Sequence, residues 1–431
     1  MNLRLQKIDA LIVATLIIIS GLFFYKAGYI EPIVPSPPHE VPSLPDTQTN
    51  LSQEELPLPP TSIITATRRD VSPTDEGVHY DEIRIEREWW YYGAVFTSER
   101  SELKDWVLHI SFNHLAYGDL LGTNKPDLLV VSLHSPTGEN YGGMINKKRY
   151  AGIINTGTLI ATAPGVNIEF EKSWAEGQYP SWHVHVEDRD IDQDHEIVID
   201  LDYHAPSLPV WTLGSRAFDK SESKIASYVY LGCTVSGTVI IDGKKYSVAG
   251  IGHHEHAWTP NAVTRGFING WDWFTIAMDN GWQLYLTNYY PTPQVITSKT
   301  TRLNPFGSLL LTTDNGQTIT ELKNIDFTIT RYEEKIFPLV KMPADFTIIG
   351  KPSINPLYFV SQSLLFGSNI HLSIDISTTT SIDTVWKFPT YVGMKTGSCR
   401  IQGMLSWSDT AGDHQIQLTG IGTSWSMRAL L

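Results

Sequence analysis

Two aromatic segments that carry acids and imidazoles are the part of this chain best suited to chemistry. Residues 251–259 read IGHHEHAWT, and residues 270–274 read GWDWF after a short gap. If these segments pair as strands, an ionisable carboxyl group lies among large rings, where desolvation raises its pKa and favours the proton-donating form. The pattern therefore indicates acid–base chemistry in apolar surroundings.

Acid-catalysed addition of water to a carbon–carbon double bond fits these side chains. The reaction needs a proton donor, surroundings that tolerate a carbocation, and a positioned water molecule. Asp272 lies between Trp271 and Trp273 and is our candidate donor, with the ring of Trp258 stabilising the cation by about 0.5–2 kcal/mol. His256 would orient the acid or the water. The alternative for Asp272 and His256 is a structural role or plain contact with a ligand.

Alternation along a strand decides which of these side chains can meet. His254, His256 and Trp258 share one face of a regular strand, whereas Glu255 points to the other face unless a bulge intervenes. Residues 88–91, EWWY, follow the same rule, so at most one of the two tryptophans lines a cavity. Glu88 is expected to be buried and hydrogen-bonded, because an isolated inward carboxylate is costly. The candidate ligand-binding residues are Glu88, Trp90, Tyr92, His254, Glu255, Trp271 and Trp273.

A metal-dependent hydrolase is a further alternative. His254-x-His256 and His183-x-His185 each place two imidazoles on one face of a strand, and Glu255 could complete a zinc site that activates water. The chain has neither an HExxH motif nor a cysteine pair at metal-ligand spacing, so we predict no metal. It also has no Gly-x-Ser-x-Gly elbow, phosphate loop or dinucleotide fingerprint, and we predict no cofactor.

The elements that must position these residues are strands. From about residue 80 onward, period-two alternation dominates, and no segment there has a long helical period. The pairs Asp242-Gly243, Asn280-Gly281 and Asn315-Gly316 lie between strand-like runs and are typical of tight hairpin turns. We expect an all-β fold of two antiparallel units, with a polar break near residues 217–223. The predicted domains are residues 79–219 and 220–431.

The N-terminal region is expected to anchor the chain in a membrane. Residues 10–25 contain no charge and are flanked by Lys7 and Lys26. As a helix they would span roughly 24 Å, slightly less than the hydrocarbon core of a bilayer. A cleaved signal peptide is the alternative. The denser positive charge before this segment predicts a single pass in residues 1–30, with a cytoplasmic N-terminus and the folded region outside. Nine prolines between residues 31 and 61 indicate an extended linker, which we bound at residues 31–78.

Composition excludes some partners. The formal net charge is −14 and no dense run of lysine or arginine occurs, so nucleic acid is not an expected partner. The chain has 13 tryptophans and 19 tyrosines, a supply that suits cores and pockets for apolar ligands. Cys233 and Cys399 either form one bridge or are two buried free thiols.

An ordered series of motifs resembles a known family. The motifs are EWWY at 88–91, SYVY at 227–230, SGTVIIDG at 236–243, VAGIGHHEHAW at 248–258 and GWDWF at 270–274. Together they resemble the lipocalin-like family that includes carotenoid 1,2-hydratase (hydroxyneurosporene synthase) and the AttH-type proteins. The resemblance covers roughly residues 80–431. It implies two lipocalin-like antiparallel β-barrel domains with an apolar pocket and, for the hydratases, addition of water to a terminal isoprenoid double bond.

The match to the hydratase motif has two departures. The family pattern resembles Asp-His-Asn-Trp followed by Trp-Asp-Trp, and the corresponding residues here are Glu255 to Trp258 and Trp271 to Trp273. Glu255 keeps an acid but lengthens it, and Ala257 lacks an amide. We therefore expect a membrane-anchored, extracytoplasmic protein that binds a hydrophobic, isoprenoid-type molecule and hydrates it without a cofactor. A non-catalytic lipid carrier is the main alternative.

Overall fold

The computed structural model describes a folded region that begins at residue 71. The described residues are 71–80, 87–115, 127–147, 150–151, 154–155, 159–213, 226–259, 268–291, 307–317, 319–322, 324–334, 341–351, 371–388, 390–409 and 412–430. The predicted anchor and most of the predicted linker lie outside these ranges. Within them, no helix has the length and apolar character needed to cross a bilayer.

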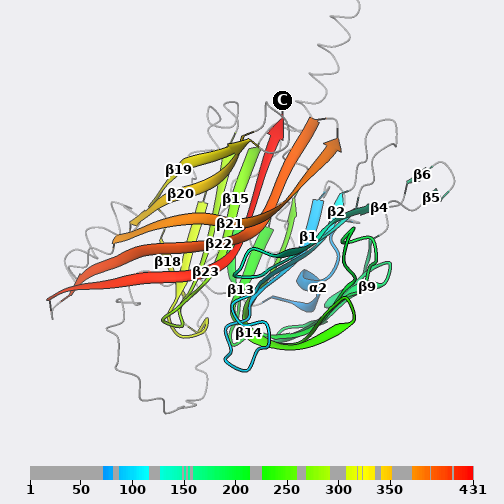
Figure 1. Cartoon of the computed structure of the whole chain (residues 1–431), viewed down its shortest axis with the longest axis horizontal. Coiled ribbons are helices and arrows are strands. Elements are labelled where there is room, and N and C mark those ends of the chain that lie inside the picture. The colour runs from blue at the N-terminus through cyan, green and yellow to red at the C-terminus, as the bar shows by residue number, and fades with distance from the viewer. Residues whose placement is uncertain are drawn as a thin grey trace, which may run out of the picture.

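The described chain is built almost entirely of antiparallel strands in two curled sheets (Figure 1). The first sheet has the order β4-β3-β2-β1-β14-β13-β11-β10-β9-β8-β7, with β12 also paired to β13. Its strands are β1 (Arg87–Val95), β2 (Val107–Leu115), β3 (Asp127–His134), β4 (Asn140–Lys147), β7 (Leu159–Ala161), β8 (Val166–Phe170), β9 (Ser173–Gln178), β10 (Ser181–Val186), β11 (Ile197–His204), β12 (Val210–Leu213), β13 (Ala226–Ile241) and β14 (Lys244–Thr259).

The second sheet follows the first in sequence and has the order β18-β17-β16-β15-β23-β22-β21-β20-β19. Its strands are β15 (Ile268–Met278), β16 (Gln283–Pro291), β17 (Gly307–Thr312), β18 (Ile319–Leu322), β19 (Asn324–Glu334), β20 (Lys341–Lys351), β21 (His371–Phe388), β22 (Thr390–Asp409) and β23 (Gly412–Leu430). Two further short strands, β5 (Tyr150–Ala151) and β6 (Ile154–Asn155), pair with each other. The all-β, antiparallel prediction is confirmed for the described residues.

Local sequence explains why these segments form strands. In β11 the apolar residues Ile199, Leu201 and Tyr203 are buried, and the intervening Asp200 and Asp202 are not, which is the alternation of a strand with one covered face. At the turn between β13 and β14, Asp242 and Gly243 have φ values of 50° and 78°, as a hairpin turn of this kind requires. Sequence periodicity therefore located both the strands and this turn.

The change from one sheet to the other does not fall at the predicted boundary. The expected division at residues 219–220 assigned β13 and β14 to the second unit. Both strands pair in the first sheet instead, because residues 251–259 of β14 pair with the whole of β1, from Arg87 opposite Thr259 to Val95 opposite Ile251, and β13 pairs with β14. The sheets change between Thr259 and Ile268. The polar break at residues 217–223 therefore does not mark the boundary between the sheets, which is set by the long-range pairing of β1 and β14.

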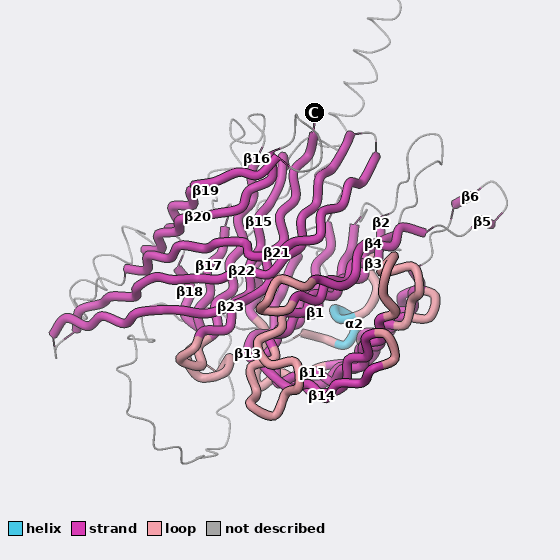
Figure 2. The backbone as a smooth tube through the Cα atoms, in the orientation of Figure 1, coloured by secondary structure: helices cyan, strands magenta, loops and turns pink. Residues whose placement is uncertain are grey.

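The two sheets have separate interiors and pack against each other (Figure 2). A third apolar cluster joins them, with Tyr91 and Val229 from the first sheet and Trp273, Tyr285 and Trp425 from the second. The two cysteines lie in different interiors and are free thiols, so the bridge considered above does not form.

The segment that precedes β1 lies within the curl of the first sheet (Figure 1). It contains the single-turn helix α2 (Pro73–Glu76), and its residues Asp75, Glu76 and His79 are at most 4% exposed. The predicted linker, which extended to residue 78, is therefore too long at its C-terminal end. Ser72 and Asp75 form a capping box, with each side chain accepting the other residue's backbone N–H, which accounts for the helical turn after Pro73.

We predict that Gln283 couples the two sheets. Its side-chain oxygen accepts the backbone N–H of Gly232, at a bulge in β13, over 2.6 Å, and its amide donates to the Gly252 carbonyl over 3.2 Å. Gln283→Leu should lower the free energy of unfolding by about 2–4 kcal/mol, because two buried backbone groups lose their partners. Chemical denaturation measures the loss. Gln402→Leu, at an exposed position of β22, is the control, and equal losses in both variants would contradict the prediction.

Candidate functional site

Three neighbouring strands line the part of the first sheet's interior where the ionisable residues gather. On β14, His254, His256 and Trp258 all point inward, as alternation predicts. The register brings Trp90 and Tyr92 of β1 opposite His256 and His254, respectively. On the other side, β13 brings Tyr228 opposite His256 and Tyr230 opposite His254. All of these side chains are fully buried.

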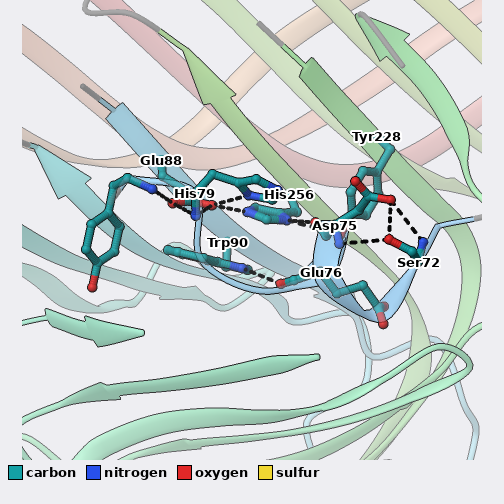
Figure 3. A network of polar contacts seen from close by, with 9 residues as sticks. Ser72, Asp75, Glu76, His79, Glu88, Trp90, Tyr228 and His256 are labelled. Atoms are coloured by element: carbon teal, nitrogen blue, oxygen red, sulfur yellow. Dashed lines mark hydrogen bonds and ion pairs between the residues drawn. The ribbon is translucent and has the colours of Figure 1, made fainter. Parts of the chain in front are cut away.

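Glu88 joins β1 to the preceding segment. Its Oε2 atom accepts the backbone N–H groups of His79 and Tyr80, each over 2.8 Å. Its Oε1 atom lies 2.8 Å from His79 Nδ1 and 2.8 Å from His256 Nε2. Glu88 is thus a buried carboxylate satisfied by hydrogen bonds, as expected, and it fixes residues 79–80 against the sheet (Figure 3).

The segment before β1, residues 71–80, is also held through its backbone carbonyl groups. The Nδ1 atom of His256 lies 3.0 Å from the Asp75 carbonyl oxygen and 3.1 Å from the Tyr228 hydroxyl. The Trp90 indole N–H donates to the Glu76 carbonyl over 3.1 Å (Figure 3). Burial lowers the pKa of His256 well below 6.5, so this imidazole is neutral at physiological pH. His256 can therefore position other groups but cannot supply a proton from an imidazolium.

Glu76 is the ionisable group of this region that keeps a proton near neutrality. Its side chain is 1% exposed, and burial raises its pKa to about 7, although the backbone N–H of Tyr179 opposes the shift by donating to both carboxyl oxygens over 3.0 and 3.1 Å. The Tyr230 hydroxyl donates to Glu76 Oε1 over 3.4 Å. A carboxyl group with a pKa near the operating pH is suited to general acid catalysis.

Next to Glu76 is a group of four aromatic side chains with buried polar atoms, namely Tyr92 OH, Tyr203 OH, His254 Nε2 and Trp182 Nε1. None of the four atoms has a partner at hydrogen-bond geometry among the described residues, but Trp182 Nε1 faces the Glu76 carboxyl group and lowers its pKa. The four side chains form a connected set, because the His254 ring lies 4.4 Å from that of Tyr92 and 4.7 Å from that of Trp182, and Tyr92 lies 5.3 Å from Tyr203. Buried polar groups are nearly always paired, so the other three atoms point to a ligand or to bound water. We call the four side chains the aromatic wall.

The aromatic wall has both donors and acceptors. His254 Nδ1 lies 3.0 Å from the Tyr91 carbonyl oxygen and must donate to it, which leaves Nε2 as an acceptor. Burial lowers the pKa of His254 to about 3, so this ring stays neutral. Trp182 offers a donor, and the hydroxyl groups of Tyr92 and Tyr203 offer either role. Tyr230 links the wall to Glu76, since its ring lies 4.7 Å from that of Trp182.

An open groove of about 630 Å³ lies over the outer face of β8 to β11. Its lining consists mostly of outward-facing polar residues of these strands, namely Asn167, Glu176, Gln178, Ser181, His183, Asp202 and His204. Trp182 and Tyr203 border the groove, but their side chains are buried on the opposite face of the sheet. The groove is therefore separate from the aromatic wall.

Asp272 does not belong to this site, which corrects the predicted catalytic trio. It is buried on β15, in the second sheet, whereas His256 and Trp258 are in the first. Its Oδ2 atom accepts a hydrogen bond from Tyr290 over 2.5 Å and pairs with Arg428 over 2.7 Å. Alternation also places Asp272 on the opposite face of β15 from Trp271 and Trp273. These two tryptophans belong to or pack against the third apolar cluster, which joins the sheets. His256 and Trp258 do meet, with ring centroids 5.0 Å apart.

The other predicted residues divide between two places. Glu88, Trp90, Tyr92 and His254 line the interior of the first sheet, whereas Trp271, Trp273 and Glu255 lie between the sheets. Glu255 accepts hydrogen bonds from Tyr285 over 2.8 Å and Ser227 over 3.2 Å, and burial raises its pKa to about 8. The predicted set is therefore not one site.

The alternative metal site is not assembled either. His183 and His185 are on the outer face of β10, where they pair with Asp202 over 2.7 Å and Asp200 over 2.9 Å. His254 and His256 point into the interior, and Glu255 points away from both pairs. Strand alternation alone separates Glu255 from its two neighbours.

Sequence reasoning missed Glu76, His79, Tyr228, Trp182 and Tyr203. Two signals were available. Ser72-Pro-Thr-Asp75 is a capping-box pattern that marks the start of an ordered turn at the end of the proline-rich region. Tyr228 and Tyr230 are in a motif that was noticed, but their contacts with β14 required the register of β13.

Comparison with known proteins supports the fold. No family model and no curated protein sequence matches this chain. An AttH protein from Nitrosomonas europaea matches with a TM-score of 0.51 and 13% identity, covering 93% of this chain and 100% of that one. Kievitone hydratase from Nectria haematococca matches with a TM-score of 0.50 and 12% identity, covering 85% of this chain and 98% of that one. The fold is therefore lipocalin-like, and its structural neighbours are AttH-type and hydratase-type proteins.

We predict that Glu76 makes stability depend on pH. The pKa of Glu76 is about 7 in the folded chain and near 4.5 when exposed. Its contribution to the free energy of unfolding is therefore fully present below pH 4.5 and is lost as pH rises through 7. Glutamine does not ionise, so Glu76→Gln avoids this loss. Between acid and mildly alkaline pH, the free energy of unfolding of the variant should rise by up to about 3 kcal/mol relative to that of the wild type. Urea unfolding across this range measures the difference. Glu169→Gln, at an exposed position of β8, should show no such trend, and parallel curves for wild type and Glu76→Gln would contradict the prediction.

Proposed function

We propose that this protein binds a small, largely apolar molecule against the aromatic wall and adds water to one of its carbon–carbon double bonds. One observation carries the proposal. A buried carboxyl group that keeps its proton near neutral pH, Glu76, lies beside three buried polar atoms that lack a partner among the described residues, Tyr92 OH, Tyr203 OH and His254 Nε2. A proton donor and hydrogen-bonding positions that can hold a water molecule are two of the things that such a reaction requires of a protein. One structural neighbour is itself named as a hydratase.

The reaction follows from the chemistry of these groups. Glu76 would donate its proton to one alkene carbon, leaving a carbocation at the adjacent carbon. Rings such as those of Trp182 and Tyr92 would stabilise this cation by about 0.5–2 kcal/mol. The oxygen of a water held by His254 Nε2 would then bond to the cation, and a water proton would return to the Glu76 carboxylate. The balance is alkene plus water to alcohol, and the acid is regenerated.

The substrate class is also a proposal. His254 Nε2 accepts and the Tyr92 and Tyr203 hydroxyl groups can donate or accept, so the molecule or its bound water should carry complementary polar groups on an otherwise apolar body. An isoprenoid with an oxygen substituent has this character. A membrane anchor in residues 10–25, with the folded region outside the cytoplasm, would keep the site close to such lipids.

A non-catalytic carrier is the second candidate. It is favoured by the two hydrogen bonds that Tyr179 N–H donates to the Glu76 carboxyl oxygens, since binding alone leaves these bonds in place. A carrier would use the same aromatic wall and would hold its ligand unchanged.

Glu76→Gln separates the two candidates. If Glu76 is the proton donor, this variant should lose at least about 100-fold in turnover, because general acid catalysis contributes about 10²–10⁴-fold, while ligand affinity stays within a few-fold. The measurement is incorporation of heavy oxygen from labelled water into isoprenoid alcohols, with affinity followed by tryptophan fluorescence. Glu169→Gln is the control for a lost surface carboxylate. Binding without incorporation by the wild type would favour the carrier.

Anchoring has its own test. The full chain should remain in the membrane pellet after a carbonate wash and be released by detergent, because residues 10–25 would span the bilayer. A chain that lacks residues 1–30 should move to the supernatant. Release of the full chain by carbonate would exclude an integral anchor.

A further inference from the structure

We infer that His79, Glu88 and His256 form a binding site for a divalent transition-metal ion, with zinc as the first candidate. Their ligand atoms are His79 Nδ1, Glu88 Oε1 and His256 Nε2, and all three lie within 4.8 Å of one another. The three side chains are between 0% and 2% exposed. This site differs from the metal alternative considered for the sequence, with which it shares only His256, and it does not depend on the proposed hydration.

The donor set has the right chemistry. Two imidazole nitrogens and one carboxylate oxygen are ligands that zinc and several other first-row divalent ions use in proteins. Three protein ligands also leave a coordination position for water, as in catalytic sites. The ligands come from two strands and from the segment before β1, so the fold brings together residues that are far apart in sequence.

The surroundings orient Glu88 for this role. Its Oε2 atom already accepts the backbone N–H groups of His79 and Tyr80, each over 2.8 Å. These bonds fix the plane of the carboxylate and direct Oε1 toward the two imidazoles, each 2.8 Å away. Carboxylates that bind metal ions are themselves usually held by hydrogen bonds of this kind.

The tautomer of His256 decides whether a metal ion or a proton lies between its Nε2 atom and Glu88 Oε1. When Nδ1 donates to the Asp75 carbonyl over 3.0 Å, the Nε2 atom of the neutral ring has a lone pair that faces the Glu88 carboxylate oxygen. Two acceptors 2.8 Å apart need a cation between them. Donation from Nδ1 to a backbone carbonyl is also the usual arrangement of a metal-bound imidazole. If Tyr228 instead donates to Nδ1, Nε2 can carry a proton to Glu88 and no ion is required.

Binding an ion requires a small expansion. Ligand atoms about 2.1 Å from an ion and about 90–109° apart are separated by about 3.0–3.4 Å. The two imidazole nitrogens must therefore move away from Glu88 Oε1 by a few tenths of an ångström and, from a separation of up to 4.8 Å, toward each other. His79 and His256 belong to separate segments, so their rings can move independently of each other.

The test uses the purified full chain, stripped with a chelator and then dialysed against zinc alone. Elemental analysis should find about one zinc per chain in the wild type and less than about 0.2 in Glu88→Gln and in His256→Gln, because each removes a ligand. His183→Gln should keep about one zinc per chain. This control removes an outward histidine that is paired with Asp202 over 2.7 Å, so it reports adventitious surface binding.

A second measurement covers the case in which the ligand variants fail to fold. X-ray absorption at the zinc edge of the wild type should show two imidazole nitrogens at about 2.0–2.1 Å and an oxygen at about 2.0–2.2 Å, with no sulfur. Less than about 0.2 zinc in the wild type, a shell without two imidazoles, or zinc lost from His183→Gln but kept in folded His256→Gln would each overturn the inference.

Discussion

The buried carboxylate of Glu88 is the contact on which the interior of the first sheet depends. A carboxylate without solvent is stable only when its oxygens are paired. Glu88 Oε2 accepts two backbone N–H groups, and Oε1 lies 2.8 Å from two imidazole nitrogens. These partners come from β14 and from the segment before β1. One side chain thereby fixes the position of that segment, and with it the position of Glu76, whose carbonyl is bound by the Trp90 indole. The candidate acid is thus held both at its carboxyl group, by Tyr179, and by these contacts farther away.

The strands and the facing of their side chains could be predicted from the sequence, because both follow from local periodicity. Alternation correctly placed His254, His256 and Trp258 on one face of β14, and Glu255 on the other. It also separated Trp89 from Trp90, of which only Trp90 lies in the first interior. The cost of burying an unpaired carboxylate also predicted that Glu88 would be hydrogen-bonded, and the structure confirms this. These inferences needed no knowledge of which strands are neighbours.

The site itself could not be predicted, because it depends on pairings between distant segments. Asp272 follows His256 by 16 residues, and this short separation in sequence suggested proximity in space. The chain passes from one sheet to the other between them, so the two residues belong to separate sheets. Glu76 was missed because it lies within the predicted linker. Composition gave no sign that this segment, which precedes β1, lies in the interior of the first sheet.

The two faces of β14 meet different surroundings, and this has an evolutionary consequence. Even-numbered residues from 254 to 258 face the first interior, whereas His253 and Glu255 contact Thr275 and Tyr285 of the second sheet. Selection for a new ligand can therefore act on alternate codons of one short stretch and leave the docking of the two sheets intact. Homologous chains could diverge in chemistry at every second position while the intervening positions record their common architecture.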